Sequence, residues 1–440
     1  MFIMFEELID NYIRFLQSLT VEHFIRLFWF YIFFEFLRYF VLEFLVLNLW
    51  KLSKFFNRKK YARAKKDFMF EYPLVSIIIP GKNEGKHLYK LITSLNEQTY
   101  KNTEVIVVDD GSDDDTPVIG RDLEKAGMID KFIRNEVRGG KASGANTALR
   151  FTKGKYIVHL DADCSYDRDA IEKIIIPFYM DKDVAGVGGN VMVRNYDDSL
   201  VTSLQAIEYY DTISIGRVVT SHLGIYRIIS GAFGAFRADA LEQVKGWDIG
   251  PGLDGDITVK LRKLGYKIKF EQEAVCLTSV PNTFKKLTHQ RLRWDKSLIR
   301  FRVRKHKDVL VPNQAFNFLN FFAFMENITY NLVLNFKWYI YLLDMVANYP
   351  SQLVNIIITN ILLYTGTNFI KFVIYSLYRA RANASYTYFL IYIPCMVFYF
   401  GYYLRVVRTI AYFQEFFFKR SYKDPWNPEK TSAHAQRMKL

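Results

Sequence analysis

Two pairs of aspartates lie at the ends of short apolar runs in the middle of the sequence. Asp109 and Asp110 close the run VVDD, and Asp161 and Asp163 close HLDAD. Because alternate residues of a strand point to the same side, Asp161 and Asp163 can both reach one cation. Oxygen ligands select Mg²⁺ or Mn²⁺, and such an ion can neutralise a departing diphosphate. Aspartates also occur in ordinary turns at the ends of strands, which is the alternative interpretation. Two such pairs in one domain favour a ligand-binding site.

A third acidic pair, Asp254 and Asp256, begins the segment PGLDGDITVKLRKLGY, which reads as a helix that Gly265 ends. Aspartate at a helix start commonly serves as a cap. The alternative is a general base near an acceptor hydroxyl. Both interpretations stay open on the residues alone.

Two further segments carry groups suited to a phosphate or a sugar. RGGKASGANTALR places Lys141 after two glycines and before a helical pattern, where a helix N-terminus could receive phosphate. It lacks P-loop spacing, and a solvated lysine in a glycine loop is the alternative. HQRLRWDKS sets Gln290, Arg293 and Trp294 within about one helical turn. Arginine suits an anionic phosphate, and an indole face suits a sugar ring.

The elements expected around these residues alternate between strand and helix. The runs VSIIIP, TEVIVVDDGS and KYIVHLDADCS are β-rich and end in polar residues or proline, and apolar residues at helical spacing lie between the first two. This pattern predicts an α/β domain with a mostly parallel sheet. Ligands of such sheets bind beyond the carboxyl ends of the strands, where the aspartate pairs fall.

The composition indicates a membrane protein. Apolar residues concentrate in 24–50 and 314–412, and the net charge of +14 gathers at 51–66 and 291–307, beside those regions. Basic residues flanking apolar segments favour an anionic lipid surface over nucleic acid as the partner. The three cysteines are far apart in sequence, which suits a reducing compartment.

Segments 27–50, 328–347, 351–377 and 386–406 are long enough to cross a bilayer, and 4–19 and 313–327 are expected to lie at its surface. The charges inside 27–50 should face neighbouring helices, although a surface-lying amphipathic helix is the alternative. The side of the C-terminal tail stays open. The expected domains are an N-terminal anchor with its basic flank (1–66), the α/β domain (70–300), interfacial helices (301–327), transmembrane helices (328–412) and a polar basic tail (413–440).

The order of the motifs over about residues 75–300 resembles the processive family 2 glycosyltransferases that are embedded in membranes. Hyaluronan, chitin-oligosaccharide, poly-N-acetylglucosamine and cellulose synthases belong to this group. The resemblance implies a GT-A fold, a UDP-sugar donor, a growing glycan as acceptor, and Mg²⁺ or Mn²⁺. It also implies a multi-pass protein of the plasma membrane with its catalytic domain in the cytoplasm and room for an accessory subunit.

The resemblance also implies roles for individual residues. Asp256 matches the aspartate of the family's Thr-Glu-Asp motif and would be the base. Asp254 then stands in place of the threonine and Gly255 in place of the glutamate. Either Asp254 substitutes for the missing carboxylate near the acceptor, or the acceptor is held differently. The remaining implied contacts are Asp109, Asp110, Lys141, Asp161, Gln290 and Arg293 to the donor, Asp161 and Asp163 to the metal, and Trp294, Ser230 and Gly231 to the acceptor.

Together these features predict an inverting transferase that polymerises a sugar from a UDP-sugar, with N-acetylglucosamine favoured, and exports the product. A transferase that adds one sugar to a lipid acceptor would share the aspartate pairs. An inactive membrane scaffold or sugar-nucleotide sensor is the alternative from another functional class, and measurable UDP release would exclude it.

Overall fold

The computed structural model describes residues 2–248, 252–312, 317–378 and 386–423. The basic loop 379–385 and most of the expected polar tail lie outside the described residues. The chain divides into two compact units, one made of residues 1–49 and 325–409 and the other of residues 50–324 and 410–440. The domain limits expected from the sequence remain predictions.

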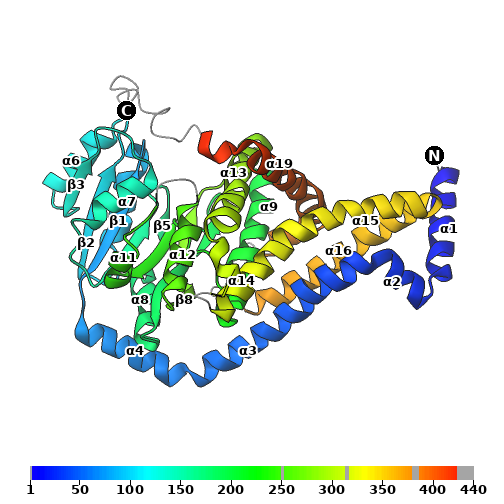
Figure 1. The fold of residues 1–440 in the computed structure, drawn as a ribbon, viewed down its shortest axis with the longest axis horizontal. Helices are drawn as coiled ribbons and strands as arrows, with labels where there is room; N and C mark the ends of the chain where they lie inside the picture. Colours follow the sequence, from blue (N-terminus) through cyan, green and yellow to red (C-terminus); the bar gives the residue numbers. More distant parts are fainter. Residues whose placement is uncertain (1, 249–251, 313–316, 379–385, 424–440) are drawn as a thin grey trace. The chain divides into compact units, whose positions relative to one another are not determined.

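The second unit is built on an eight-stranded sheet with the order β3-β2-β1-β4-β7-β6-β8-β5 (Figure 1). β3, β2, β1 and β4 are mutually parallel, β7 runs antiparallel to both β4 and β6, and β8 is parallel to β6. The predicted α/β fold is confirmed as a mixed, mostly parallel sheet. The strands are β1 Val75–Gly81, β2 Thr103–Asp109, β3 Lys131–Arg134, β4 Tyr156–Leu160, β5 Ser165–Tyr166, β6 Val184–Val193, β7 Phe233–Arg237 and β8 Lys267–Thr278.

Helices connect and cover these strands. Several are short, and two π-helical stretches, η2 and η3, continue α9 and α13 without a break. The helices of this unit are α4 Arg58–Glu71, α5 Gly85–Asn96, α6 Thr116–Lys125, α7 Lys141–Leu149, α8 Ala170–Met180, α9 Leu200–Glu208, η2 Tyr209–Ile215, α10 Gly216–His222, α11 Ala238–Gln243, α12 Leu253–Lys263, α13 Phe284–Ser297, η3 Leu298–Lys305, η4 Lys307–Leu310 and η8 Arg420–Lys423.

Small residues bring α7 close to the sheet. Ala142, Ala145 and Ala148 are fully buried and pack with Ile106 and other strand residues in one core cluster. A methyl group added to Gly144 would lie 3.0 Å from Pro80 Cβ of β1. Because the helix lies this close to the strands, its first residue is held at the carboxyl edge of the sheet.

Glycines also let side chains pack directly against β6. A Cβ added to Gly188 would lie 2.1 Å from the Tyr226 hydroxyl, and one added to Gly189 would lie 2.1 Å from the Phe233 ring. Gly186 leaves similar room for a side chain of the same segment. Residues 226–233 therefore occupy space that side chains of β6 would otherwise fill.

The other unit is helical. Its helices are α1 Phe2–Ser18, α2 Val21–Phe30, η1 Tyr31–Leu42, η5 Thr329–Val333, α15 Leu334–Asn348, η6 Pro350–Gln352, α16 Leu353–Ser376, α17 Tyr386–Leu390, α18 Ile393–Phe398 and η7 Tyr399–Tyr403, while α3 Glu43–Phe56, α14 Phe318–Ile328 and α19 Leu404–Phe418 have residues in both units.

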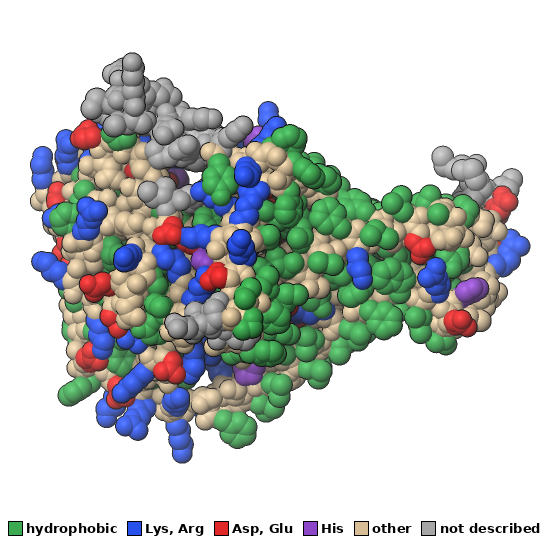
Figure 2. All heavy atoms as spheres, viewed as in Figure 1, with side chains coloured by type: hydrophobic (Ala, Val, Ile, Leu, Met, Phe, Trp, Pro, Cys, Tyr) green, Lys and Arg blue, Asp and Glu red, His purple; other side chains and the backbone are tan. Residues whose placement is uncertain are grey.

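Within the described residues, Pro350–Ser376 is the one helix long and apolar enough to cross a membrane. It coincides with the span expected at 351–377. Figure 2 shows hydrophobic side chains along the visible face of the helical unit. Large apolar residues of α15 and α16, among them Ile340, Leu343 and Leu362, are exposed. The other expected spans are helical, and their crossing of a membrane remains a prediction.

The charged residues expected within 27–50 all have partners. Arg38 is buried and pairs with Glu43 at 3.2 Å and with Glu326 at 2.9 Å. Glu35 pairs with Arg405. The pairs with Glu326 and Arg405 join different helices of this unit, as expected for charges that face protein.

Candidate active site

The first aspartate pair organises the loop that precedes α7. Asp110 follows β2 and is buried, and its carboxylate accepts hydrogen bonds from the backbone N–H groups of Gly139 at 2.9 Å and Gly140 at 2.7 Å. Asp109 accepts a hydrogen bond from the Ser112 backbone at 2.9 Å. Asp110 therefore fixes the glycine-rich turn and thereby the start of α7, and Asp109 fixes the loop that directly follows β2.

Lys141 is the first residue of α7, and its Nζ meets the end of β4. It forms an ion pair with Asp161 and donates to the carbonyl of Gly231 at 3.4 Å. Burial disfavours the charged form of Lys141, but Asp161 and Asp254 outweigh it and raise the pKa of the ammonium. The structure thus brings together residues that the sequence placed on the donor side and on the acceptor side.

Three carboxyl groups share the same edge of the sheet. Burial and the neighbouring Asp161 raise the pKa of Asp163. Burial, Asp163 and Asp161 raise the pKa of Glu84 to about 7. Glu84 follows β1, the strand between β2 and β4, and it is not among the site residues expected from the sequence. Its place after a parallel strand, in PGKNE, is the signal that could have found it.

The residues present fit a divalent cation. Mg²⁺ and Mn²⁺ are bound by one or two carboxylates together with phosphate oxygens and water, and Asp161 and Asp163 supply two such groups. Burial, followed by repulsion from the neighbouring carboxylates, raises the pKa values of Asp163 and Glu84, and a bound cation would favour their charged forms. Among the described residues no group of three or more His, Cys, Asp or Glu forms a complete metal-binding set.

Gly231 lies at the centre of the site, after Ser230 and just before β7. Its carbonyl oxygen is 2.8 Å from His159 Nδ1. Burial and Lys141 lower the pKa of His159 to about 3, so the ring is neutral and Nδ1 donates to this carbonyl. His159 and Asp161 alternate along the chain at the end of β4, so both face this segment.

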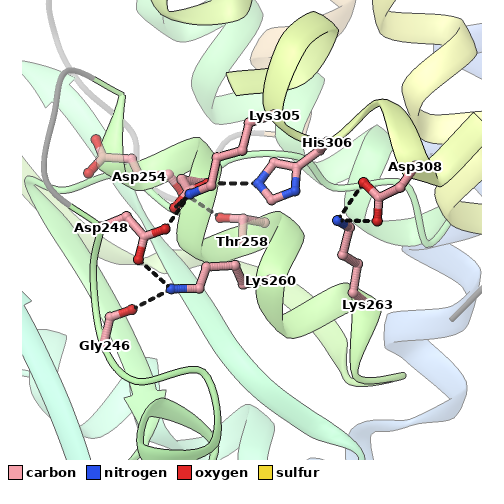
Figure 3. Close-up of polar contacts among 10 residues, drawn as sticks. Gly246, Asp248, Asp254, Thr258, Lys260, Lys263, Lys305, His306 and Asp308 are labelled. Carbon is pink, nitrogen blue, oxygen red and sulfur yellow. Dashed lines mark hydrogen bonds and ion pairs between the residues drawn. The ribbon is translucent and has the colours of Figure 1, made fainter. Parts of the chain in front are cut away.

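Asp254, near the start of α12, lies directly against Gly231. A Cβ added to Gly231 would lie 2.5 Å from Asp254 Oδ1. Burial raises the pKa of Asp254, and Lys141 opposes this effect. Figure 3 shows the Asp254 side chain pointing away from Lys305 and His306.

Asp256, two residues later, has different surroundings. It is fully buried, and its carboxylate accepts hydrogen bonds from Lys305 Nζ at 2.7 and 2.8 Å and from His306 Nε2 at 2.7 Å. Burial raises its pKa, but the hydrogen bonds from His306 and Lys305 outweigh burial and lower it. Lys305 also pairs with Asp248, which accepts a hydrogen bond from Lys260 at 2.8 Å (Figure 3).

The QRLRW residues lie in one turn of α13. Arg293 and Trp294 are exposed, and Gln290 Oε1 is buried without a hydrogen bond from any described residue. Arg291, which the sequence motifs assign no role, forms a two-pronged pair with Glu208 at 2.8 and 2.7 Å. Its guanidinium carbon lies 4.7 Å from the centre of the Trp294 ring.

Part of the basic run 291–307 forms ion pairs within the α/β unit, and its contact with an anionic lipid surface remains a prediction. Arg291 pairs with Glu208, Arg304 with Glu415 at 2.7 Å, and Lys305 with aspartates of the same unit. These cations are neutralised by carboxylates that lie far away in sequence. These pairs hold α13 and η3 within the α/β unit.

Known proteins support the fold and the family. Residues 76–245 match glycosyl transferase family 2. Curated relatives include poly-β-1,6-N-acetyl-D-glucosamine synthases of Staphylococcus epidermidis, 34% identical over 228 residues, and of Staphylococcus aureus (strain COL), 31% identical over 223 residues. The matches cover 50% of this chain, and the chain spans about half the length of these relatives, 53%.

Among solved structures, a mannosyltransferase from Pyrobaculum calidifontis, in complex with GDP-Man and Mn²⁺, aligns with a TM-score of 0.55 at 19% identity. The alignment covers 86% of this chain and 99% of the mannosyltransferase. At this identity the likeness concerns the fold, which is GT-A-like. Residues 76–245 therefore form a domain of glycosyl transferase family 2.

Proposed function

We propose that the protein transfers N-acetylglucosamine from a UDP-sugar to a hydroxyl of a growing glycan, with inversion at the anomeric carbon. The observation that carries the proposal is the convergence of Lys141, Asp161, Asp254 and Gly231 at the carboxyl edge of the sheet. The choice of sugar is supported by relatives named poly-β-1,6-N-acetyl-D-glucosamine synthase.

On the donor side, Asp109 and Asp110 shape the loop that would receive the uridine, and Lys141 and Arg293 supply positive charge for the diphosphate. Gln290, with a buried oxygen and an amide group, would contact the donor beside Arg293. Asp161 and Asp163 would hold Mg²⁺ or Mn²⁺. When bound, that ion supplies charge that stabilises the leaving diphosphate.

On the acceptor side we propose Asp254 as the general base, in place of Asp256. Both carboxylates of the pair are candidates, but the lysine and histidine that bind Asp256 make it the weaker proton acceptor. Asp254 lies against Gly231 and its pKa is raised, which brings it closer to the pH at which a base is most effective. Ser230 and Gly231 would line the acceptor, and Trp294 would stack on its sugar.

The proposed step conserves atoms and charge. The acceptor hydroxyl gives its proton to Asp254 while its oxygen forms a bond to the anomeric carbon of the donor. The bond between that carbon and the diphosphate oxygen breaks, and UDP leaves with the electron pair. Lys141 and Arg293 stabilise the negative charge that develops on the diphosphate.

We further propose that addition is processive and that the polymer leaves through the helical unit of a multi-pass plasma-membrane protein with its catalytic unit in the cytoplasm. The apolar helix Pro350–Ser376 and the exposed apolar residues of α15 and α16 support a membrane location. Addition of a single sugar to a lipid acceptor is the competing function, and product length separates the two.

The test is UDP release by purified, lipid-reconstituted protein supplied with a panel of UDP-sugars and Mg²⁺ or Mn²⁺, with the products sized. Release with UDP-N-acetylglucosamine and a long product is expected. A product carrying one sugar on lipid would favour the competing function, and no release with any UDP-sugar would refute the proposal. Asp254→Asn should lower turnover by about 10²- to 10⁴-fold while UDP binding persists. Equal losses of turnover and UDP binding would contradict a base role.

A further inference from the structure

Arg291 and Glu208 form an ion pair beside Trp294, the residue proposed to contact the acceptor sugar. Both Nη atoms of Arg291 donate to separate oxygens of Glu208, at 2.8 and 2.7 Å. The two side chains are 11% and 8% exposed, so the pair is largely shielded from water. Glu208 is the last residue of α9, and it therefore ties the QRLRW turn to a helix 83 residues earlier in the chain.

The same guanidinium supports the Trp294 ring. Arg291 and Trp294 are separated by three positions on α13, which places their side chains side by side on the helix. The Arg291 guanidinium carbon lies 4.7 Å from the ring centre, within the range of a cation–π contact. Trp294 itself is 40% exposed, so much of the ring faces outward.

The two arginines of QRLRW have different surroundings, which suit them to different roles. Arg293 is exposed and suited to meet a diphosphate. Arg291 has both Nη atoms engaged by a carboxylate and is in contact with an aromatic ring. A phosphate would have to displace Glu208 to reach it in the same two-pronged way.

We infer that Arg291, held by Glu208, is a positioning residue that fixes the Trp294 ring in the orientation that receives the acceptor sugar. This inference rests on the proposed acceptor role of Trp294. An exposed indole without such a support samples several rotamers and must lose that freedom when the sugar binds. The pair removes this cost before the acceptor arrives.

The test compares Arg291→Lys and Glu208→Gln with the unchanged protein, each also in a Trp294→Ala background. Lysine keeps the charge but loses the planar fork, and glutamine keeps the shape but loses the carboxylate charge. Two constants are measured: the KM for a soluble β-linked N-acetylglucosamine pentasaccharide in acceptor-stimulated UDP release, and the Kd for UDP. Lys131→Ala, which removes the contact of Lys131 with the Phe151 ring (4.0 Å), is the matched control for losing a cation–π contact elsewhere.

Both variants should raise the pentasaccharide KM about tenfold, equivalent to about 1.4 kcal/mol, and leave the UDP Kd within about twofold. In the Trp294→Ala background neither variant should raise the KM further, because its effect acts through the missing ring. The control should change neither constant.

Several results would overturn the inference. A weakened UDP Kd for Arg291→Lys would make Arg291 a donor-binding residue. An unchanged pentasaccharide KM in both variants, or full additivity with Trp294→Ala, would show that the pair does not act on the ring. If Arg291→Lys fails to fold, Glu208→Gln carries the same comparison. UDP release by the unchanged protein tests the proposed function separately, so its failure is distinguishable.

Discussion

Replacing Asp254 or Asp256 by asparagine should change thermal stability in different ways, although the two residues lie in one turn of α12. Asp256 is fully buried and bonded to Lys305 and His306. Removing one partner of a buried ion pair costs about 3–5 kcal/mol. The Lys305 side chain is 36% exposed, so water screens its share, and we expect a loss of about 2 kcal/mol. The unit has roughly 300 residues, and an unfolding entropy of about 2.1 cal/mol/K per residue then gives a Tm loss of about 3 °C.

Asp254→Asn should leave Tm unchanged or raise it. Burial disfavours the charged form of Asp254, as its raised pKa shows, so a neutral side chain of the same shape removes an unfavourable charge. A carboxylate that is retained at a cost to stability is typical of a catalytic position.

Thermal unfolding can be followed by intrinsic tryptophan fluorescence, because Trp247 of the α/β unit is buried and becomes exposed to water on unfolding. The folded pKa of Asp256 lies below the ordinary 3.8. Its stabilising effect is therefore complete above about pH 4 and is lost as the pH falls through the folded pKa. The Tm difference caused by Asp256→Asn should be constant from about pH 8 to 5 and shrink below about pH 4. Equal Tm losses for the two variants, or none for Asp256→Asn, would refute the reasoning.

Three further predictions concern the same edge of the sheet. Lys141→Met should weaken UDP binding roughly 10- to 100-fold, measured by calorimetry, because hydrogen bonds to charged groups contribute about 1.5–3 kcal/mol; unchanged binding would remove Lys141 from the donor site. Gly231→Ala should lower UDP release about 10²-fold with UDP binding retained, since the new methyl would displace the Asp254 carboxylate; normal turnover would contradict that contact. In EDTA, Glu84→Gln should gain Tm over the unchanged protein as the pH rises from about 4.5 to 7, because the raised pKa of Glu84 makes its ionisation destabilising in that window; a pH-independent difference would contradict the raised pKa.

Much of the parallel half of the sheet can be predicted from the sequence. The runs that become β1, β2 and β4 are continuous, apolar and bounded by turn residues, and parallel strands place their ends at one edge. The local pattern alone therefore places Asp110 and Asp161 near each other. The other half of the sheet is harder to predict, because β6 is rich in glycine and β8 carries polar residues in place of an apolar run.

The site also depends on contacts that no local pattern contains. The motif that contains Asp256 does not show that Lys305 and His306, about fifty positions later, donate hydrogen bonds to its carboxylate. Likewise, Glu208 lies 83 positions before Arg291, so neither residue reveals the pair by its neighbours in sequence. The local sequence indicates which residue types could do chemistry, and the fold determines which of them face one another.

The glycines of β6 have a consequence for how acceptor preference could change. Because Gly186, Gly188 and Gly189 carry no side chains, Tyr226 and Phe233 pack directly on the backbone of β6. These contacts set the distance between the strand and the segment 226–233. That segment includes the residues proposed to line the acceptor. An alanine at one of these glycines would push the segment away from the strand and so move the acceptor-lining residues without replacing any of them. Variation in the size of the accepted sugar should therefore be sought in the strand beneath the site as well as in the residues that surround it.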